Sequence, residues 1–166
     1  MNLADDAFAE PNVLYRGESR AGGMRFVPVG EAMAPLRHTS RAVAAGDVDN
    51  DGGMDLLIVN RDARAYLLMN RAPGRGNWIR ISVREGDALA LGARVLAKVD
   101  GRWLAREVQR TGSYLASNDP RVLIGLAEAG EAGEVRVRWA DGEVESFGSI
   151  SAGETVTLRR GEGRSL

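Results

Sequence analysis

The sequence contains no cysteine and only one histidine among its 166 residues. The missing thiols exclude a disulfide framework, a thiolate zinc site and a cysteine nucleophile, and they leave the redox compartment undetermined. The single histidine, His38, lies two positions before Ser40, but no third residue or nucleophile motif completes a hydrolytic triad. The pattern therefore favours a loop role for His38 over a catalytic one.

Long apolar runs and an excess of one charge are also absent. The apolar runs are short, as at residues 55–60, and fall far below the roughly 20 residues that a membrane-spanning helix needs. With 22 basic and 23 acidic residues the formal net charge is −1, and the two signs alternate along most of the chain. We therefore expect no membrane insertion and no nucleic-acid partner.

The first twelve residues carry acidic side chains and lack the apolar core of a signal peptide. Either the protein stays in the cytoplasm, or a leader or preceding domains lie outside this chain.

Alternation of apolar and polar residues is the dominant pattern. Three segments show the period of two that is typical of half-buried strands: residues 79–83, 135–139 and 156–159. Asp-Gly pairs at 100–101 and 141–142 each separate two alternating runs, and because both residues tolerate positive φ they predict tight hairpins. Together with twenty-one glycines, these patterns predict an all-β fold with one helical turn near residues 30–36.

The segment 71–77 is rich in proline and glycine and predicts a linker or a wide loop. We place a boundary there, with one unit at residues 12–75 and a second at residues 76–160. Residues 12–29 and 65–81 share a faint pattern in which an apolar run, a glycine-rich turn and a second apolar run follow one another. Self-similarity at a spacing of about 50 residues indicates propeller-type repeats.

A short loop holds four aspartates at positions 1, 3, 5 and 9: Asp47, Asp49, Asp51 and Asp55. This spacing matches the first half of an EF-hand calcium loop, and it lets a tightly curled backbone turn three carboxylates toward one point. Gly52 permits the sharp bend, which brings the carbonyl of Gly53 into the same shell.

The ligand set favours calcium, because every donor is an oxygen and calcium takes six to eight of them. An EF-hand would carry a bidentate glutamate at position 12, but that position is Ile58, inside an apolar run. The loop therefore leads into a strand and is not part of an EF-hand. The alternative is a solvated turn rich in Asp, Asn and Gly.

The stretch AAGDVDNDGGMDLLIVN at residues 44–60, followed by YLLMN at 66–70, resembles an FG-GAP or VCBS repeat, the calcium-loop blade of integrin-like β-propellers. From Asn77 onward the chain resembles the ASPIC/UnbV domain that follows such repeats in the cartilage acidic protein-like family. The matching stretches are residues 77–81, 91–95, 106–121, 124–126 and 135–142. The resemblance implies a propeller-type blade with a calcium loop, followed by an antiparallel β-sandwich or barrel-like domain.

The resemblance also implies an extracellular or periplasmic protein whose surfaces mediate adhesion or other interactions. It carries the calcium-ligand role onto the four aspartates and the Gly53 carbonyl. A propeller needs four or more blades, so the edges of a single blade must be covered by the C-terminal domain, by a second copy of the chain, or by blades outside this sequence.

Two functions remain open. The first is a non-enzymatic calcium-binding β protein that acts as an interaction or adhesion module for a protein or glycan. The second is a carbohydrate-active enzyme, or an accessory domain of a larger calcium-dependent enzyme. The absence of a cofactor motif or a catalytic pair favours the first.

A candidate ligand contact lies in the polar segment 113–120, where Tyr114, Asn118 and Asp119 are able to hydrogen-bond a sugar or a peptide. A structural role for this segment, as an ordered connection with an Asn-Asp-Pro turn, is the favoured reading.

Overall fold

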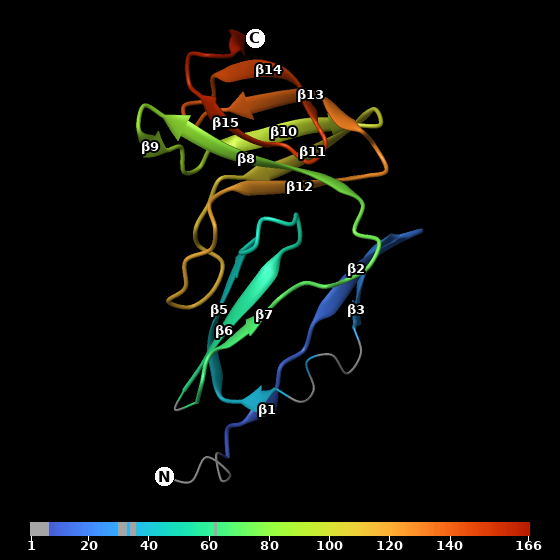
Figure 1. The fold of residues 1–166 in the computed structure, drawn as a ribbon, viewed down its shortest axis with the longest axis vertical. Coiled ribbons are helices and arrows are strands. Elements are labelled where there is room, and N and C mark those ends of the chain that lie inside the picture. Colours follow the sequence, from blue (N-terminus) through green and yellow to red (C-terminus); the bar gives the residue numbers. More distant parts are fainter. Residues whose placement is uncertain (1–6, 30–32, 34–35, 62) are drawn as a thin grey trace.

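A computed structural model describes residues 7–29, 33, 36–61 and 63–166. These residues form sixteen strands joined by turns and loops, with no α-helix among them (Figure 1). Within the described ranges no helix has the length and apolar character needed to cross a membrane. The all-β prediction is confirmed, whereas the helical turn expected near residues 30–36 falls mostly outside the described residues.

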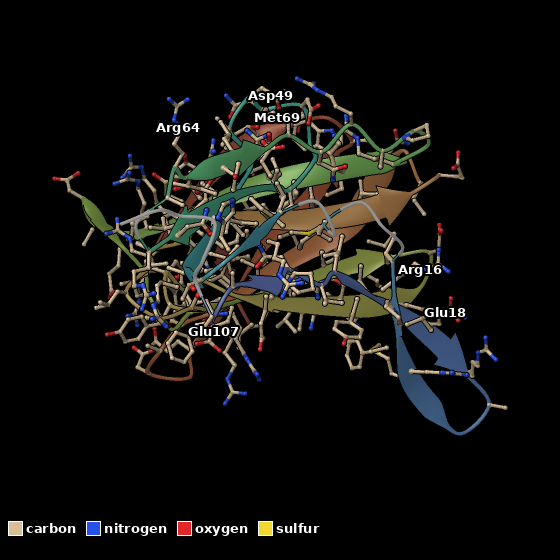
Figure 2. All side chains as sticks on the ribbon, turned by 90° about the horizontal axis from the view of Figure 1, so that it is seen from below. Arg16, Glu18, Asp49, Arg64, Met69 and Glu107 are labelled. Carbon is tan, nitrogen blue, oxygen red and sulfur yellow. The ribbon has the colours of Figure 1, made fainter. Side chains whose placement is uncertain are left out.

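Strands β1 to β7 form three small antiparallel sheets. The pairs are β1 (Glu10–Pro11) with β4 (Arg37–His38) and β2 (Tyr15–Arg20) with β3 (Gly23–Pro28), and the third sheet has the order β5 (Ser40–Gly46), β6 (Asp55–Asn60), β7 (Tyr66–Leu68). The β2–β3 hairpin projects from the rest of the molecule (Figure 2).

The β5–β6–β7 sheet has one apolar face that is open to solvent. Along β6 the side chains of Asp55, Ile58 and Asn60 are buried, whereas those of Leu57 and Val59 are exposed. The partner of Leu57 on β7 is also an exposed leucine, so the open face continues across the strand pair.

Strands β8 to β16 form two larger sheets, which we call the C-terminal unit. One sheet has the order β11 (Arg102–Glu107), β10 (Arg94–Val99), β13 (Glu131–Arg138), β14 (Val144–Ser151), β16 (Arg164–Ser165). The other has the order β12 (Val122–Ala127), β8 (Asn77–Glu85), β15 (Thr155–Arg159), and β9 (Ala88–Leu89) also pairs with β8. β15 runs parallel to β8, with Thr155 opposite Arg80, so this sheet departs from the purely antiparallel arrangement expected.

Both predicted Asp-Gly hairpins are present. β10 and β11 pair from Arg94 opposite Glu107 to Val99 opposite Arg102, and Asp100 and Gly101 between them both have positive φ, at 46° and 78°. β13 and β14 are likewise joined by a tight turn, in which the Gly142 N–H donates to the Trp139 carbonyl at 2.9 Å. Local sequence therefore determines these two connections.

The two sheets of the C-terminal unit enclose one apolar core. The inward side chains of β8, Ile79, Ile81 and Val83, are fully buried, and residues of β10, β12 and β13 pack against them. Every buried member of this cluster lies between Ile79 and Leu158. Period-two alternation in the sequence thus corresponds to the inward and outward faces of the sheets.

An ion-pair cluster at Arg160 joins the β13–β14 turn to the end of β8. The guanidinium group donates to carboxylates of Asp141, Glu143 and Glu85. Its hydrogen bond to Asp141, helped by the Glu143 backbone N–H, holds the pKa of that carboxyl below its ordinary value. Because the pKa is depressed in the folded state, the stability that this carboxylate contributes is present above about pH 4 and is lost as the pH falls below it.

We expect Arg160→Gln to move the pKa of Asp141 upward, toward about 3.9, because the carboxylate loses its principal donor. An NMR titration of the Asp141 side-chain carboxyl between pH 2 and 6 measures this change. Arg25→Gln, in the exposed strand β3, is the control. It should leave the midpoint of the Asp141 titration unchanged. An unchanged midpoint in Arg160→Gln would show that Arg160 does not lower the pKa of Asp141.

Candidate metal centre

The aspartate loop connects the paired ends of β5 and β6. Gly46 at the end of β5 lies opposite Asp55 at the start of β6, so residues 47–54 form a closed loop. Asn50 and Gly52 adopt positive φ, at 60° and 83°, which curls the backbone as the sequence predicts for Gly52. The loop lies against the C-terminal unit rather than projecting into solvent.

Three of the four aspartates converge. Asp47, Asp49 and Asp55 each offer a carboxylate oxygen within 4.8 Å of the others. Calcium binds oxygen at 2.3–2.6 Å, so oxygens on opposite sides of one ion lie at most about 5 Å apart. The spacing and the all-oxygen donor set therefore fit one calcium ion.

The two buried carboxylates also hold the loop in shape. Asp47 and Asp55 are only 3% and 2% exposed. Asp47 accepts the backbone N–H groups of Asp51 and Gly52, at 3.1 and 2.8 Å, and Asp55 accepts those of Val48 and Asn70, both at 2.8 Å. Asp49 lies at the surface of the molecule (Figure 2). The cluster therefore has a rigid inner side and an accessible outer side.

Asp51, the fourth predicted ligand, turns away from this cluster. Both of its carboxylate oxygens accept hydrogen bonds from the Arg75 guanidinium, at 2.9 and 2.8 Å, and one also accepts the Gly53 N–H at 2.8 Å. The Arg75 hydrogen bond, followed by that of Gly53, lowers the pKa of Asp51 to about 2. The role of Asp51 and of the Gly53 carbonyl as ligands stays a prediction.

The sequence predicts a solvated position for Arg80, but this residue is the most deeply buried arginine at the loop. It lies on β8, its side chain is 3% exposed, and it donates to Asp47 and, at 2.6 Å, to the amide oxygen of Asn50. Its guanidinium carbon lies 4.8 Å from the centre of the Trp78 ring. Its place between two isoleucines in an alternating strand indicated a polar, outward position, and only the loop of another sheet buries it.

Contacts on either side of Arg80 complete the joint between the loop and the C-terminal unit. A Cβ on Gly52 would overlap the indole of Trp78, so the loop backbone lies directly on that ring. Arg121 donates to the Asn50 amide oxygen at 3.0 Å and to the Asp47 carbonyl at 3.2 Å. The loop conformation that brings the carboxylates together is therefore the one that fits the C-terminal unit.

The segment 113–119 covers the outer edge of β5. Ser113 and Asn118 accept the backbone N–H groups of Val43 and Ala45, at 3.1 and 2.9 Å, and the Asp119 N–H donates to the Ala45 carbonyl at 2.9 Å. These bonds supply the edge strand with partners. Of the three candidate ligand-contact residues, Asn118 and Asp119 are thus used in this joint, and Tyr114 is exposed.

His38 and Ser40 do not contact each other through any hydrogen bond described for them. The His38 Nε2 atom lies 2.7 Å from the Tyr66 hydroxyl, and the Ser40 hydroxyl donates to Asn60 at 2.8 Å. His38 lies on the short strand β4 rather than in the loop expected from the sequence, and its ring contacts Tyr66.

Most of the C-terminal unit is similar to a known family. Residues 84–165 match the sequence profile described as ASPIC and UnbV. These residues form an ASPIC and UnbV domain.

The chain is also distantly similar to cartilage acidic protein 1. It is 31% identical to the protein of Homo sapiens in an alignment of 131 positions, which covers 75% of this chain and 19% of the relative. The identity to the Xenopus tropicalis protein is 31% over 162 aligned positions, with coverage of 86% of this chain and 24% of the relative. The identity to the Mus musculus protein is 32% over 123 aligned positions, with coverage of 70% of this chain and 19% of the relative. The chain spans about a fifth of the length of these relatives.

The ASPIC and UnbV domain supplies part of the joint with the aspartate loop. Ser113, Asn118, Asp119 and Arg121 all lie within the matched residues, between β11 and β12. Arg80 precedes them, on the strand that leads into the matched region. The segment between β11 and β12 therefore has a structural role in this chain, as a contact with β5.

Proposed function

We propose that this chain is a non-enzymatic calcium-binding β protein that works as an interaction or adhesion module. The convergence of the carboxylates of Asp47, Asp49 and Asp55 within 4.8 Å carries this proposal. Asp51 and the Gly53 carbonyl complete the shell when the ion is bound. Calcium adds positive charge beside Arg80, which already pairs with Asp47, and so further offsets the repulsion between neighbouring carboxylates.

The loop and its sheet act as a propeller-type blade of the FG-GAP or VCBS kind. The open face formed by Leu57, Val59 and Leu67 supports this interpretation, because blades of a propeller cover each other's apolar faces. The joint with the ASPIC and UnbV domain covers one edge of the blade, at β5.

A protein or a glycan is the expected partner, in an extracellular or periplasmic location. Extracellular calcium modules bind the ion at about 0.1 to 1 mM, a concentration that the cytoplasm does not reach. In such a location the ion fixes the loop, and the surface around it is preformed before the partner arrives.

We expect calcium to raise the melting temperature of the chelator-treated protein. At ten times the dissociation constant, binding to the folded state alone adds about 1.4 kcal/mol, or about 3 to 6 °C for a chain of this size. Asp49→Asn removes one ligand charge at the exposed side of the cluster, so we expect it to abolish most of the shift. Differential scanning calorimetry in chelator and in calcium measures both effects.

Asp87→Asn is the matched control for this experiment, because it makes the same substitution at an exposed position in the C-terminal unit. It should keep the full calcium shift. A melting temperature that calcium does not move, or a shift that survives in Asp49→Asn, would show that the loop is a solvated turn.

A further inference from the structure

We propose that Arg71 and Arg75 form an internal substitute for the cation, which binds the loop when calcium is absent and which one calcium ion displaces. This inference rests on the proposed function, because it assigns a regulatory element to the same site. The two arginines belong to the connection between β7 and β8, so the exchange would also release that connection from the loop.

Arg75 pairs with Asp51 and lies against the backbone of Gly53, the two predicted ligand residues outside the carboxylate cluster. Its guanidinium group binds both oxygens of Asp51, at 2.9 and 2.8 Å. The same group lies so close to Gly53 that a Cβ there would overlap it. A calcium ion that takes up Asp51 and the Gly53 carbonyl must therefore compete with Arg75.

Arg71 occupies the outer side of the same site. Its guanidinium nitrogen lies 3.1 Å from a carboxylate oxygen of Asp49 and 3.6 Å from one of Asp51. The Arg71 side chain is 69% exposed, whereas that of Arg75 is 29% exposed and also donates to the Asn70 carbonyl at 2.9 Å. Of the two glycines beside Arg75, Gly74 has positive φ and open space around it, whereas Gly76 packs against the Ala127 backbone.

The other two arginines at the loop are fixed. Arg80 is buried against Trp78, and Arg121 is held by Asp119 while it binds the backbone of Asp47. Both also donate to the Asn50 amide oxygen, and Arg80 in addition pairs with Asp47 of the carboxylate cluster. They therefore support the loop from the C-terminal unit in either state.

The exchange involves two arginines because together they carry the same charge as one calcium ion. Arg71 and Arg75 together bring two positive charges to the loop, and one calcium ion brings the same number. Replacing one set by the other leaves the local charge unchanged, whereas binding calcium beside both guanidinium groups would add repulsion between cations. In the structure, carboxylates of the loop pair with Arg71, Arg75 and Arg80.

Calcium titration of Arg75→Gln tests the competition. We expect isothermal titration calorimetry of the chelator-stripped protein to show calcium binding about three- to tenfold tighter than in the wild type, because an exposed ion pair no longer has to be broken. Arg25→Gln removes the same charge in the β2–β3 hairpin and should leave the affinity at the wild-type value. The double variant Arg71→Gln/Arg75→Gln should bind at least as tightly as Arg75→Gln.

Two different failures can be told apart. If Arg75→Gln binds calcium with the same affinity as the wild type, or more weakly, Arg75 does not compete with the ion. The calcium site itself would still stand. No calcium binding by any of the variants would overturn the proposed function together with this inference.

Limited trypsin digestion gives a second readout. Since calcium would free the connection, cleavage after Arg71 and Arg75 should become faster at saturating calcium than in chelator, although the protein as a whole becomes more stable. A peptide substrate digested in parallel corrects for any effect of calcium on the protease. Slower cleavage at these two sites in calcium would overturn the proposed release.

Discussion

Arg80→Met is expected to destabilise the protein by about 3 to 5 kcal/mol, measured by chemical denaturation in chelator. The substitution removes the charge but keeps an apolar stem, so it leaves the buried carboxylate of Asp47 without its guanidinium partner. The amide oxygen of Asn50 loses a 2.6 Å donor at the same time. Most of the effect is therefore the unfavourable burial of an unpaired charge.

Arg84→Met is the matched control, because Arg84 lies on the same strand and the same face as Arg80 and is only half-buried. We expect Arg84→Met to change the free energy of unfolding by no more than about 1 kcal/mol. The double variant Arg80→Met/Asp47→Asn should regain part of the lost stability, since it no longer buries a lone carboxylate. If Arg80→Met lowered the free energy of unfolding no more than Arg84→Met, the buried ion pair would not join the loop to the C-terminal unit.

Ile81→Ala is expected to lower the free energy of unfolding by about 2 to 5 kcal/mol. Ile81 lies at the centre of β8, which has β12 on one side and β15 on the other, and its side chain is fully buried in the core. Truncation removes apolar contacts and leaves a cavity that neighbours on two sheets cannot both fill. Urea denaturation followed by tryptophan fluorescence measures the loss.

Leu91→Ala removes a comparable side chain at a half-exposed position between β9 and β10 and serves as the control. It should change stability by no more than about 0.5 kcal/mol. Equal losses in the two variants would mean that the core between the sheets does not dominate the stability of the C-terminal unit.

The features that could be predicted from the sequence are those encoded locally. Alternation at residues 79–83 is enough to predict a strand with one buried face, and Asp100-Gly101 is enough to predict the turn after β10. The alternate spacing of the loop aspartates predicts that their carboxylates converge, and the structure brings three of the four together, Asp47, Asp49 and Asp55. In each case the physical cause lies within a few neighbouring residues.

The features that could not be predicted depend on residues far apart in the chain. Alternation places Arg80 on an outward face, and nothing near it in the sequence says that a loop from another sheet covers that face. The position of Asp51 is decided by Arg75, in the connection after β7. Asn118 could have been read as a ligand contact or as a structural residue, and its hydrogen bond to Ala45 favours the second reading.

The parallel pairing of β15 with β8 also affects how the protein folds during its synthesis. β8 is among the first parts of the C-terminal unit to leave the ribosome, but its neighbour β15 is among the last, since Arg80 faces Thr155. At about 5 to 20 residues per second, β8 waits several seconds with one edge open. During that interval its isoleucines and valine have no complete core to enter, so the nascent C-terminal unit is most vulnerable to aggregation just before β15 emerges.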